Sequence, residues 1–158
     1  MSNKFPLSQK YIDFINTTNV SAEFLEGTTA SGKTTVGAGV KFMRMVSQSK
    51  KKIHAIAAKT TGKAEETIIQ QDNGILDLHR NAVYCGNGDK DYKLPHIKFE
   101  DKIIYILGYS SRDKWEMVLG AQFGCVYIDE INTADIEFIR EMSTRNDYML
   151  ATLNPDDP

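Results

Sequence analysis

A short polar segment bounded by glycines has the residues needed to bind phosphate. Residues 27–34 read GTTASGKT, so two glycines enclose a loop that is followed by Lys33 and Thr34. Glycines let the backbone curl until its N–H groups point at phosphate oxygens, and a helix that begins there adds the positive end of its dipole. Lys33 would reach the β- and γ-phosphates, and the Thr34 hydroxyl would coordinate Mg²⁺. The alternative is a glycine-bounded surface turn without a ligand.

The residues on either side of this loop have the pattern that a phosphate-binding loop requires. Residues 22–26 predict a short strand, and residues 35–46 predict a helix with apolar residues at helical spacing. Gly37 and Gly39 lower helix stability by about 1 kcal/mol each relative to alanine. We therefore expect these glycines to permit close contact between the helix and a strand.

Two acidic residues directly follow an apolar run further along the chain. Residues 125–128 are all apolar and lead into Asp129 and Glu130. Such a run suits a parallel strand covered on both faces, and functional groups in parallel sheets gather at the carboxyl ends of the strands. Asp129 would bind Mg²⁺, and Glu130 would take a proton from an attacking water. Alone, this pair also fits a strand end with two solvated acids, but the phosphate-loop pattern favours the functional interpretation.

The second acid indicates the class of reaction. A hydrolase needs a base for water, whereas a nucleotide kinase transfers the phosphoryl group to another hydroxyl, so Glu130 favours an ATPase. A guanine-reading Asn-Lys-x-Asp segment is absent from the sequence, which disfavours a GTPase.

Small polar residues end the last apolar run of the chain. Residues 149–153 predict a strand, which leads to Asn154 and Pro155. Thr152 and Asn154 could form hydrogen bonds to a γ-phosphate or to its attacking water. Residues 154–158 also have the composition of a turn that stops a strand, and taken alone they favour the turn.

These motifs, in this order, resemble those of the ATPase domain of the large terminase subunit of tailed bacteriophages, the motor that drives DNA into capsids. Residues 27–34 look like its Walker A motif, and residues 125–130 look like its Walker B motif with the catalytic glutamate. Residues 151–155 look like the motif that couples hydrolysis to DNA movement, which implies coupling roles for Thr152 and Asn154. Residues 7–11 look like the segment in which a glutamine reads adenine.

The resemblance implies a role for each matching residue. Lys33 and Glu130 would be catalytic, Thr34 and Asp129 would hold Mg²⁺, and Gln9 would contact the adenine of ATP. The remaining ATP contacts would be Gly27, Thr28, Thr29, Ala30, Ser31, Gly32 and Thr35, together with Lys33 and Thr34.

The resemblance also implies partners and surroundings. We expect double-stranded DNA, a portal protein and a small terminase subunit as partners, with a homo-oligomeric ring on the procapsid in the host bacterial cytoplasm and no membrane. Residues 1–158 would form one P-loop ATPase domain, shortened at its C-terminal end and without a nuclease domain. The alternatives are a nucleotide-dependent assembly module without motor activity of its own, and another helicase-like ATPase.

The sequence departs from many family members because it has no arginine between Gly27 and Gly32. An arginine from elsewhere would then have to stabilise charge on the transferred phosphoryl group, as an arginine finger from a neighbouring subunit does. The candidates are Arg112, Arg140 and Arg145, and Arg80 is a lower-ranked fourth candidate.

Length and composition fit an ordinary globular domain. The chain has 158 residues, of which 41% are hydrophobic and 25% are charged, and it has no apolar stretch as long as a membrane helix. Cys85 and Cys125 are too few and too unpatterned for a disulfide framework or metal site, and the three histidines are scattered singly. These thiols are expected to be reduced, as in a cytoplasm.

A net charge of −2 gives no overall attraction to DNA, so DNA binding would need a local basic patch. The candidates are residues 50–52, all lysines, with Lys41 and Arg44. A solvated loop is the alternative for the lysine run.

The order of the predicted elements defines an α/β fold. We expect a first helix near residues 7–15, strands over residues 53–58 and 149–153, and a hairpin within residues 94–107. Helices are expected over residues 62–71, 112–118 and 136–142. The architecture is a three-layer sandwich with a mostly parallel sheet and a β-hairpin. The resemblance implies the additional-strand (ASCE) P-loop topology, with the Thr152 strand between the P-loop and Walker B strands.

Overall fold

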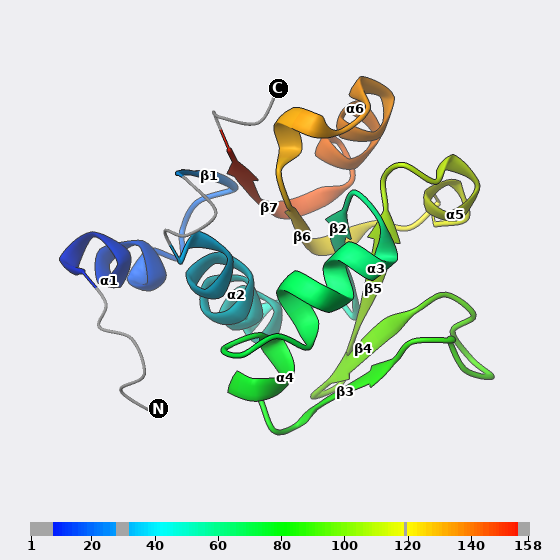
Figure 1. Ribbon diagram of the computed structural model, residues 1–158, viewed down its shortest axis with the longest axis horizontal. Helices are drawn as coiled ribbons and strands as arrows, with labels where there is room; N and C mark the ends of the chain where they lie inside the picture. Colours follow the sequence, from blue (N-terminus) through cyan, green and yellow to red (C-terminus); the bar gives the residue numbers. More distant parts are fainter. Residues whose placement is uncertain (1–7, 28–31, 119, 155–158) are drawn as a thin grey trace.

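Seven strands form one sheet in the computed structural model, which describes residues 8–27, 32–118 and 120–154. In chain order they are β1 (Ala22–Glu26), β2 (Ile53–Ala58), β3 (Ala82–Cys85), β4 (His96–Phe99), β5 (Lys102–Gly108), β6 (Phe123–Ile128) and β7 (Asn146–Leu153). Their order across the sheet is β1-β7-β6-β2-β5-β4-β3 (Figure 1). The pairs from β1 to β5 are parallel, whereas β4 pairs antiparallel with both β5 and β3.

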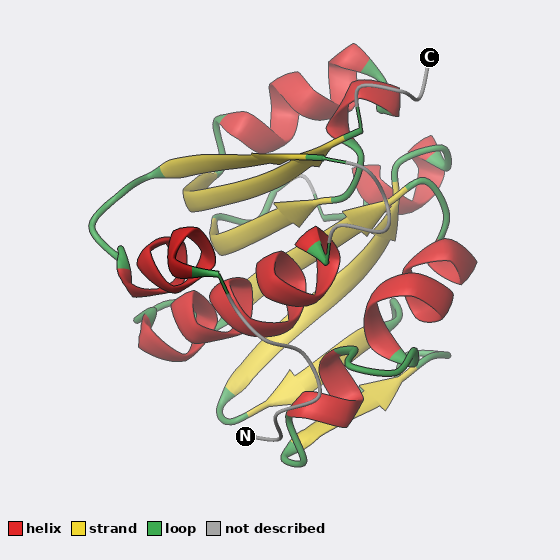
Figure 2. Cartoon of the chain, turned by 60° about the vertical axis from the view of Figure 1, so that its left-hand side comes forward, coloured by secondary structure: helices red, strands yellow, loops and turns green. Residues whose placement is uncertain are grey.

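Helices cover both faces of this sheet (Figure 2). One face carries α1 (Gln9–Asn16), η2 (Thr35–Phe42), α2 (Met43–Gln48), α3 (Thr61–Ala64), η3 (Glu65–Ile69) and α4 (Ile75–Leu78), and the other carries α5 (Arg112–Glu116) and α6 (Ile136–Ser143). A buried apolar cluster lies between the sheet and each helical layer. The predicted three-layer α/β architecture is therefore confirmed. Among the described helices, none has the length and apolar character to cross a bilayer.

The position of β7 confirms the additional-strand topology. β7 lies between β1 and β6 and is parallel to both, so residues that end these strands emerge at one edge of the sheet. Thr152 is paired in register with Leu25 of β1, and Ala151 with Ile128 of β6. The end of β7 therefore lies between the start of the phosphate-loop segment and the two acids.

The helix after the phosphate-loop segment packs closely on the sheet, as its glycines predict. η2 has π-helical hydrogen bonding and continues into α2. A Cβ atom at Gly37 would lie 3.1 Å from Leu25 Cδ1, and one at Gly39 would lie 2.9 Å from Leu78 Cδ1. The absence of a side chain at Gly37 lets η2 approach β1, and its absence at Gly39 lets η2 approach α4.

Most predicted elements are present, with some differences at their ends. The hairpin of β4 and β5 is confirmed, and Glu100 in its turn has a φ of 56°. The helix expected over residues 62–71 is built from α3 and η3. Three short elements, α4, β3 and η4 (Ile131–Thr133), were not predicted, because elements of three or four residues give little periodicity.

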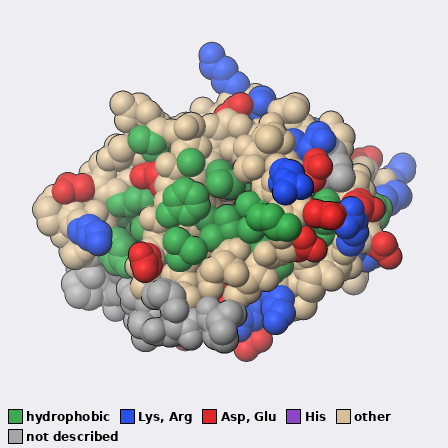
Figure 3. All heavy atoms as spheres, turned by 90° about the horizontal axis from the view of Figure 1, so that it is seen from above, with side chains coloured by type: hydrophobic (Ala, Val, Ile, Leu, Met, Phe, Trp, Pro, Cys, Tyr) green, Lys and Arg blue, Asp and Glu red, His purple; other side chains and the backbone are tan. Residues whose placement is uncertain are grey.

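Two large apolar side chains are exposed on the α5/α6 side of the sheet. On that side β1 presents Phe24, which is 54% exposed, and α6 presents Ile136, which is 64% exposed. The face seen from above Figure 1 has hydrophobic side chains gathered at its middle and charged side chains gathered at one end (Figure 3). An ion pair of Arg112 with Glu137 joins α5 to α6, and Arg112 also pairs with Glu116 within α5.

The prediction that Lys41 belongs to a basic surface patch is wrong. Lys41 is fully buried and forms an ion pair with Glu23 at 3.0 Å, so it is not on the surface. Arg44 is exposed and donates to Asn16 Oδ1 at 3.1 Å. Residues 50–52 precede β2, at the edge of the sheet opposite to the one where Asp129 lies, and Lys51 pairs with Asp147 at 3.0 Å.

A buried histidine joins the amino-terminal ends of β2 and β6. His54 Nδ1 accepts the backbone N–H of Cys125 at 2.9 Å, so the ring proton is on Nε2, which donates to the carbonyl of Lys51 at 2.9 Å. Gly124 leaves the room for this ring, because a Cβ atom there would lie 2.4 Å from His54 Cε1. Burial lowers the pKa of His54 to about 4, so the ring is neutral in the folded protein.

This histidine makes folding sensitive to acid. The unfolded chain takes up a proton at His54 below its ordinary pKa of 6.5 and the folded chain only near 4. Stability from this group is complete above pH 6.5 and is lost as the pH falls toward 4, by up to about 3 kcal/mol. We predict that His54→Asn, which keeps an acceptor for Cys125 but cannot titrate, shows a smaller loss of unfolding free energy between pH 7 and pH 4.5 in urea titrations. Equal losses in both proteins would contradict the assignment.

Candidate active site

The phosphate-loop segment begins where β1 ends and finishes where the helix begins. Thr28, Thr29, Ala30 and Ser31 lie outside the described residues. Gly27 and Gly32 have φ values of 156° and 81°, a region that favours glycine. The sequence pattern therefore places a glycine at each end of the loop, where the backbone needs one.

Lys33, which follows this segment in the sequence, is buried. Its ammonium group donates to the carbonyl of Leu153 at 2.8 Å and also to the carbonyl of Gly27. Its side chain is only 2% exposed. The ammonium group thus lies between the ends of β1 and β7, at the edge of the sheet where the acids emerge.

Asp129 directly follows β6 and its carboxylate is buried. Its Oδ1 accepts hydrogen bonds from the Tyr127 hydroxyl at 3.0 Å and the Thr152 hydroxyl at 3.2 Å. Burial raises the pKa of Asp129 above its ordinary value, and these two hydrogen bonds oppose that shift. The positive charges of Lys33 and Lys63 also oppose it. Four groups therefore favour the ionised form of this carboxylate.

The Tyr127 hydroxyl connects the two predicted metal ligands. Tyr127 is fully buried, and its side chain interacts by hydrogen bonding with Asp129, Thr152 and Thr34. Thr34 and Asp129 therefore approach the same hydroxyl from the P-loop helix and from β6. Their side chains offer a hydroxyl and a carboxylate, the hard oxygen donors that Mg²⁺ prefers.

Glu130 has a left-handed backbone, with a φ of 50° and a ψ of 57°. Its N–H donates to Thr152 Oγ1 at 2.8 Å, and this bond fixes the turn. The Tyr109 hydroxyl supports the same turn from the other side, at 3.0 Å from the carbonyl oxygen of Asp129 and 2.6 Å from Thr133 Oγ1. Both Asp129 and Glu130 line one pocket at this edge of the sheet.

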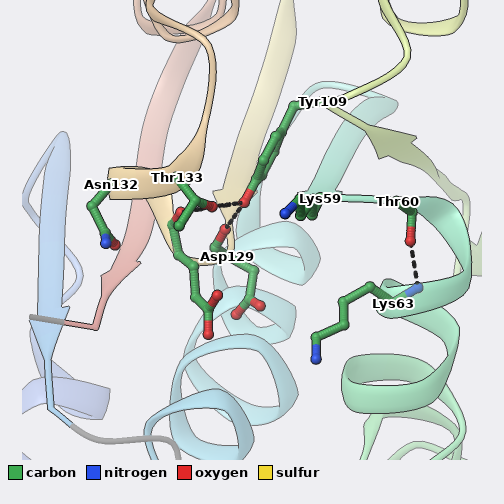
Figure 4. A pocket seen from close by; sticks show the side chains of 8 residues that line it. Lys59, Thr60, Lys63, Tyr109, Asp129, Asn132 and Thr133 are labelled. Carbon is green, nitrogen blue, oxygen red and sulfur yellow. Dashed lines mark hydrogen bonds between the residues drawn. The ribbon is translucent and has the colours of Figure 1, made fainter. Parts of the chain in front are cut away.

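That pocket has a volume of about 550 Å³ and is lined by residues that follow β2, β5 and β6. The lining residues are Lys59, Thr60, Lys63, Tyr109, Asp129, Glu130, Asn132 and Thr133. Figure 4 shows Asp129 and Lys63 projecting into the pocket from opposite walls, with Lys59 between them at the rear. Two lysines therefore stand across the pocket from the two predicted acids.

The other predicted site residues lie further from this cluster or are held by other contacts. Asn154 follows β7, and its N–H donates to Asn132 Oδ1 at 3.3 Å. Gln9 is the first residue of α1, is exposed, and donates from Nε2 to Asp13 Oδ1 at 2.8 Å. Pro155 lies outside the described residues. The structure thus brings together Lys33, Thr34, Asp129, Glu130 and Thr152, whereas Gln9 is on a separate helix that packs on η2.

Three further residues of this region were not predicted from the sequence. Tyr127 lies two residues before Asp129, where a strand places both side chains on the same face, so the spacing was an available signal. Lys63 lies in the helix expected over residues 62–71 and Tyr109 follows the expected hairpin, but neither segment had a pattern that indicated a functional residue. They follow β2 and β5, and their approach depends on the strand order.

Searches of known proteins identify this fold. The large terminase from a thermophilic bacteriophage matches with 17% sequence identity and a TM-score of 0.72 over 96% of this chain and 40% of that chain. The same terminase in complex with ATP-gamma-S matches with 16% identity and a TM-score of 0.70, over 95% and 38% of the two chains. Its complex with ADP matches with 19% identity and a TM-score of 0.68, over 94% and 38%. No protein-family model and no curated protein matches the chain.

These matches show that the chain has the fold of part of a bacteriophage large terminase. The resemblance inferred from the sequence motifs is confirmed at this level. The chain spans about two fifths of the length of the solved chains that it matches, 40% in the first of them.

The Thr152 hydroxyl can be tested as the group that fixes the Glu130 turn. We predict that Thr152→Val leaves the Glu130 N–H without its partner, and that its amide exchange accelerates by about tenfold or more, since the loss of a buried acceptor costs about 1–3 kcal/mol. Hydrogen-exchange NMR would measure this rate. Thr152→Ser keeps the hydroxyl and is the matched control. Unchanged Glu130 exchange in the valine variant would show that another group holds the turn.

Proposed function

We propose that this chain binds ATP with Mg²⁺ and hydrolyses it, as part of a motor that moves double-stranded DNA into a viral procapsid. The observation that carries this proposal is the placement of Asp129 and Glu130, through Thr152, beside the buried Lys33 at one edge of the sheet. The phage large terminase that has this fold was crystallised with ATP-gamma-S and with ADP, which supports an adenine nucleotide as the ligand.

The donor set fits a magnesium ion. Thr34 and Asp129 both approach the Tyr127 hydroxyl, and Asp129 Oδ2 is not used by the hydrogen bonds that Tyr127 and Thr152 make to Oδ1. Thr34 and Asp129 would hold the ion, Asp129 directly or through water. When bound, Mg²⁺ neutralises phosphate charge and orients the triphosphate.

The protein residues would bind the phosphates, accept a proton from water and contact the adenine. The Lys33 ammonium would exchange its contacts with the Gly27 and Leu153 carbonyls for phosphate oxygens, with the loop residues 27–35 supplying backbone N–H groups. Glu130 would accept a proton from the attacking water, because the left-handed turn directs its carboxylate toward the pocket. Gln9 would contact adenine from α1.

Hydrolysis also needs positive charge where negative charge develops on the phosphoryl group. Lys59 and Lys63 of the same chain line the pocket. Among the described residues, these two lysines could supply this positive charge. Arg112 forms an exposed ion pair with a glutamate and Arg145 a partly exposed one, and surface pairs of this kind contribute about 0–1 kcal/mol. Such ion pairs open readily, so an arginine could be donated to the site of a neighbouring subunit. The candidates for this arginine finger remain Arg112, Arg140, Arg145 and Arg80. An arginine finger and a lysine of the same chain could act together.

The movement of DNA is proposed on the same basis. Thr152 and Asn154 would couple the state of the nucleotide to the rest of the motor, because Thr152 contacts both acids and Asn154 follows it on β7. In this proposal the chain acts within a ring of subunits in the host cytoplasm. Its protein partners are a portal protein and a small terminase subunit.

Two substitutions test hydrolysis directly. We predict that Lys33→Ala abolishes tight ATP binding, because the β- and γ-phosphates then face only backbone dipoles. Glu130→Gln should keep ATP and Mg²⁺ binding and reduce turnover by about 10²-fold or more, the scale of a lost general base. Nucleotide affinity and phosphate release would be measured for both, with duplex DNA added in a parallel set. Unchanged turnover in both variants would refute the proposed ATPase.

The proposed role of Lys63 in stabilising charge on the phosphoryl group gives a further prediction. Lys63→Ala should lower kcat by about 10²-fold with KM nearly unchanged, since charge is stabilised mainly in the transition state. Lys63→Arg should keep part of the rate. The matched control is Lys114→Ala, which removes an exposed lysine of α5 outside the pocket. Equal rates for the two alanine variants would assign the charge to another residue.

A further inference from the structure

Three side chains that commonly bind metal ions meet at the opposite end of the sheet order from the phosphate-loop strand. Cys85 ends β3 and His96 begins β4, and the two residues are directly paired across these antiparallel strands. Asp89 comes from the loop that joins them. The Cys85 sulfur, an Asp89 carboxylate oxygen and a His96 ring nitrogen all lie within 4.8 Å of one another. None of these residues lines the candidate active-site pocket.

The loop holds the Asp89 carboxylate in place. Its Oδ1 accepts the backbone N–H groups of Asp91 at 3.0 Å and Tyr92 at 2.8 Å. Gly88 precedes it with a φ of 73°, and a Cβ atom there would lie 2.0 Å from the carbonyl oxygen of Lys93, so the turn requires glycine. The loop therefore occupies one oxygen and leaves Oδ2 directed at His96.

His96 has an oxygen acceptor at each ring nitrogen. Its side chain is fully buried, and Nδ1 lies 2.8 Å from the carbonyl oxygen of Leu94. Nε2 lies 3.2 Å from Asp89 Oδ2, and an ionised carboxylate only accepts hydrogen bonds. A neutral ring has one N–H, so it can donate to only one of these two oxygens and directs a lone pair at the other. A second ring proton, or a cation bound at Nε2 with the ring proton on Nδ1, would satisfy both contacts.

We propose that Cys85, Asp89 and His96 bind a thiophilic divalent cation of the Zn²⁺ class. The cysteine favours a metal ion over a second proton, because a thiolate, an imidazole and a carboxylate together are ligands for Zn²⁺. Tetrahedral Zn²⁺ with nitrogen and oxygen bonds of about 2.0–2.1 Å has an N–O edge of about 3.3 Å, close to the observed 3.2 Å. A carbonyl that fixes the other nitrogen, as Leu94 does, is also usual for metal-bound histidine.

Lys98 is the competitor for this site. Its ammonium group lies 2.7 Å from Asp89 Oδ2, the oxygen that would bind the metal ion. The side chain is 47% exposed, so it can move into solvent. Binding would release the Cys85 thiol proton and displace the Lys98 contact, and it would tie the edge strand β3 to β4. The fourth metal ligand would be water.

Cobalt binding to the whole chain tests this proposal. After treatment with a chelator, Co²⁺ titration should give one bound ion with thiolate-to-cobalt charge-transfer absorption, and Zn²⁺ should displace it. Cys85→Ser and His96→Gln should lose this absorption and weaken Zn²⁺ affinity by about 10-fold or more. Cys125→Ser is the matched control, because Cys125 is buried in β6, away from the cluster. Lys98→Met should bind Zn²⁺ about twofold to fivefold more tightly, the scale of a partly exposed ion pair.

Three outcomes would overturn the proposal. They are no stoichiometric Co²⁺ or Zn²⁺ binding, equal affinity in Cys85→Ser, or loss of the absorption in Cys125→Ser only. Circular dichroism of each variant separates a lost ligand from a lost fold, and Cys85→Ser changes only one half-buried atom. Because the readout is metal binding, its result does not depend on ATP hydrolysis. An imidazolium signal from His96 at neutral pH in nitrogen NMR would assign the positive charge to a second proton instead.

Discussion

One hydroxyl group connects the strands on which the candidate active site depends. Thr152 Oγ1 accepts the Glu130 N–H and donates to Asp129 Oδ1, so a residue of β7 fixes both acids that follow β6. This contact requires β7 to lie next to β6 in parallel register, which the insertion of β7 between β1 and β6 provides. Lys33 reaches the end of the same strand at the Leu153 carbonyl. The end of β7 therefore contacts both halves of the site.

Charge at this edge of the sheet is balanced over several elements. Asp129 is buried, and isolated burial of a carboxylate is unfavourable. Tyr127 and Thr152 donate to it, while Lys33 and Lys63 provide positive charge from opposite sides. Each donor comes from a different element, so the carboxylate keeps its environment only while the helices and strands keep their relative positions. A polyphosphate with its metal ion would add charges of both signs to a site already built around such charges.

The parts of the fold that could be predicted are those that depend on local pattern. The apolar run before Asp129 and the apolar spacing after Thr35 each indicated an element that the structure contains, and Gly27 and Gly32 have φ values that favour glycine. The place of β7 followed from the family resemblance and not from periodicity. Lys63, Tyr109 and Tyr127 reach the site through the strand order and side-chain packing, which single segments do not encode. Gln9 and Asn154 match motifs, but their roles depend on contacts with a ligand.

Lys41 shows why a charged residue can be misinterpreted from its neighbours in sequence. It lies near Arg44 and the lysines at 50–52, which suggested a surface patch, yet it faces the interior from η2. Its ammonium group pairs with Glu23, donates to the carbonyls of Phe14 and Thr17, and lies 4.4 Å from the centre of the Phe14 ring.

These contacts replace much of the hydration that burial removes, which a buried charge needs in order to be tolerated. The Tyr148 hydroxyl donates to Glu23 at 2.7 Å, so the partner carboxylate is itself held in place. The carbonyls belong to the end of α1, whereas Lys41 belongs to the helix that follows the phosphate-loop segment. A buried charge with directional partners therefore fixes α1 against that helix more specifically than apolar contact would. If Gln9 contacts adenine, this lysine links the base-binding helix to the phosphate-binding one.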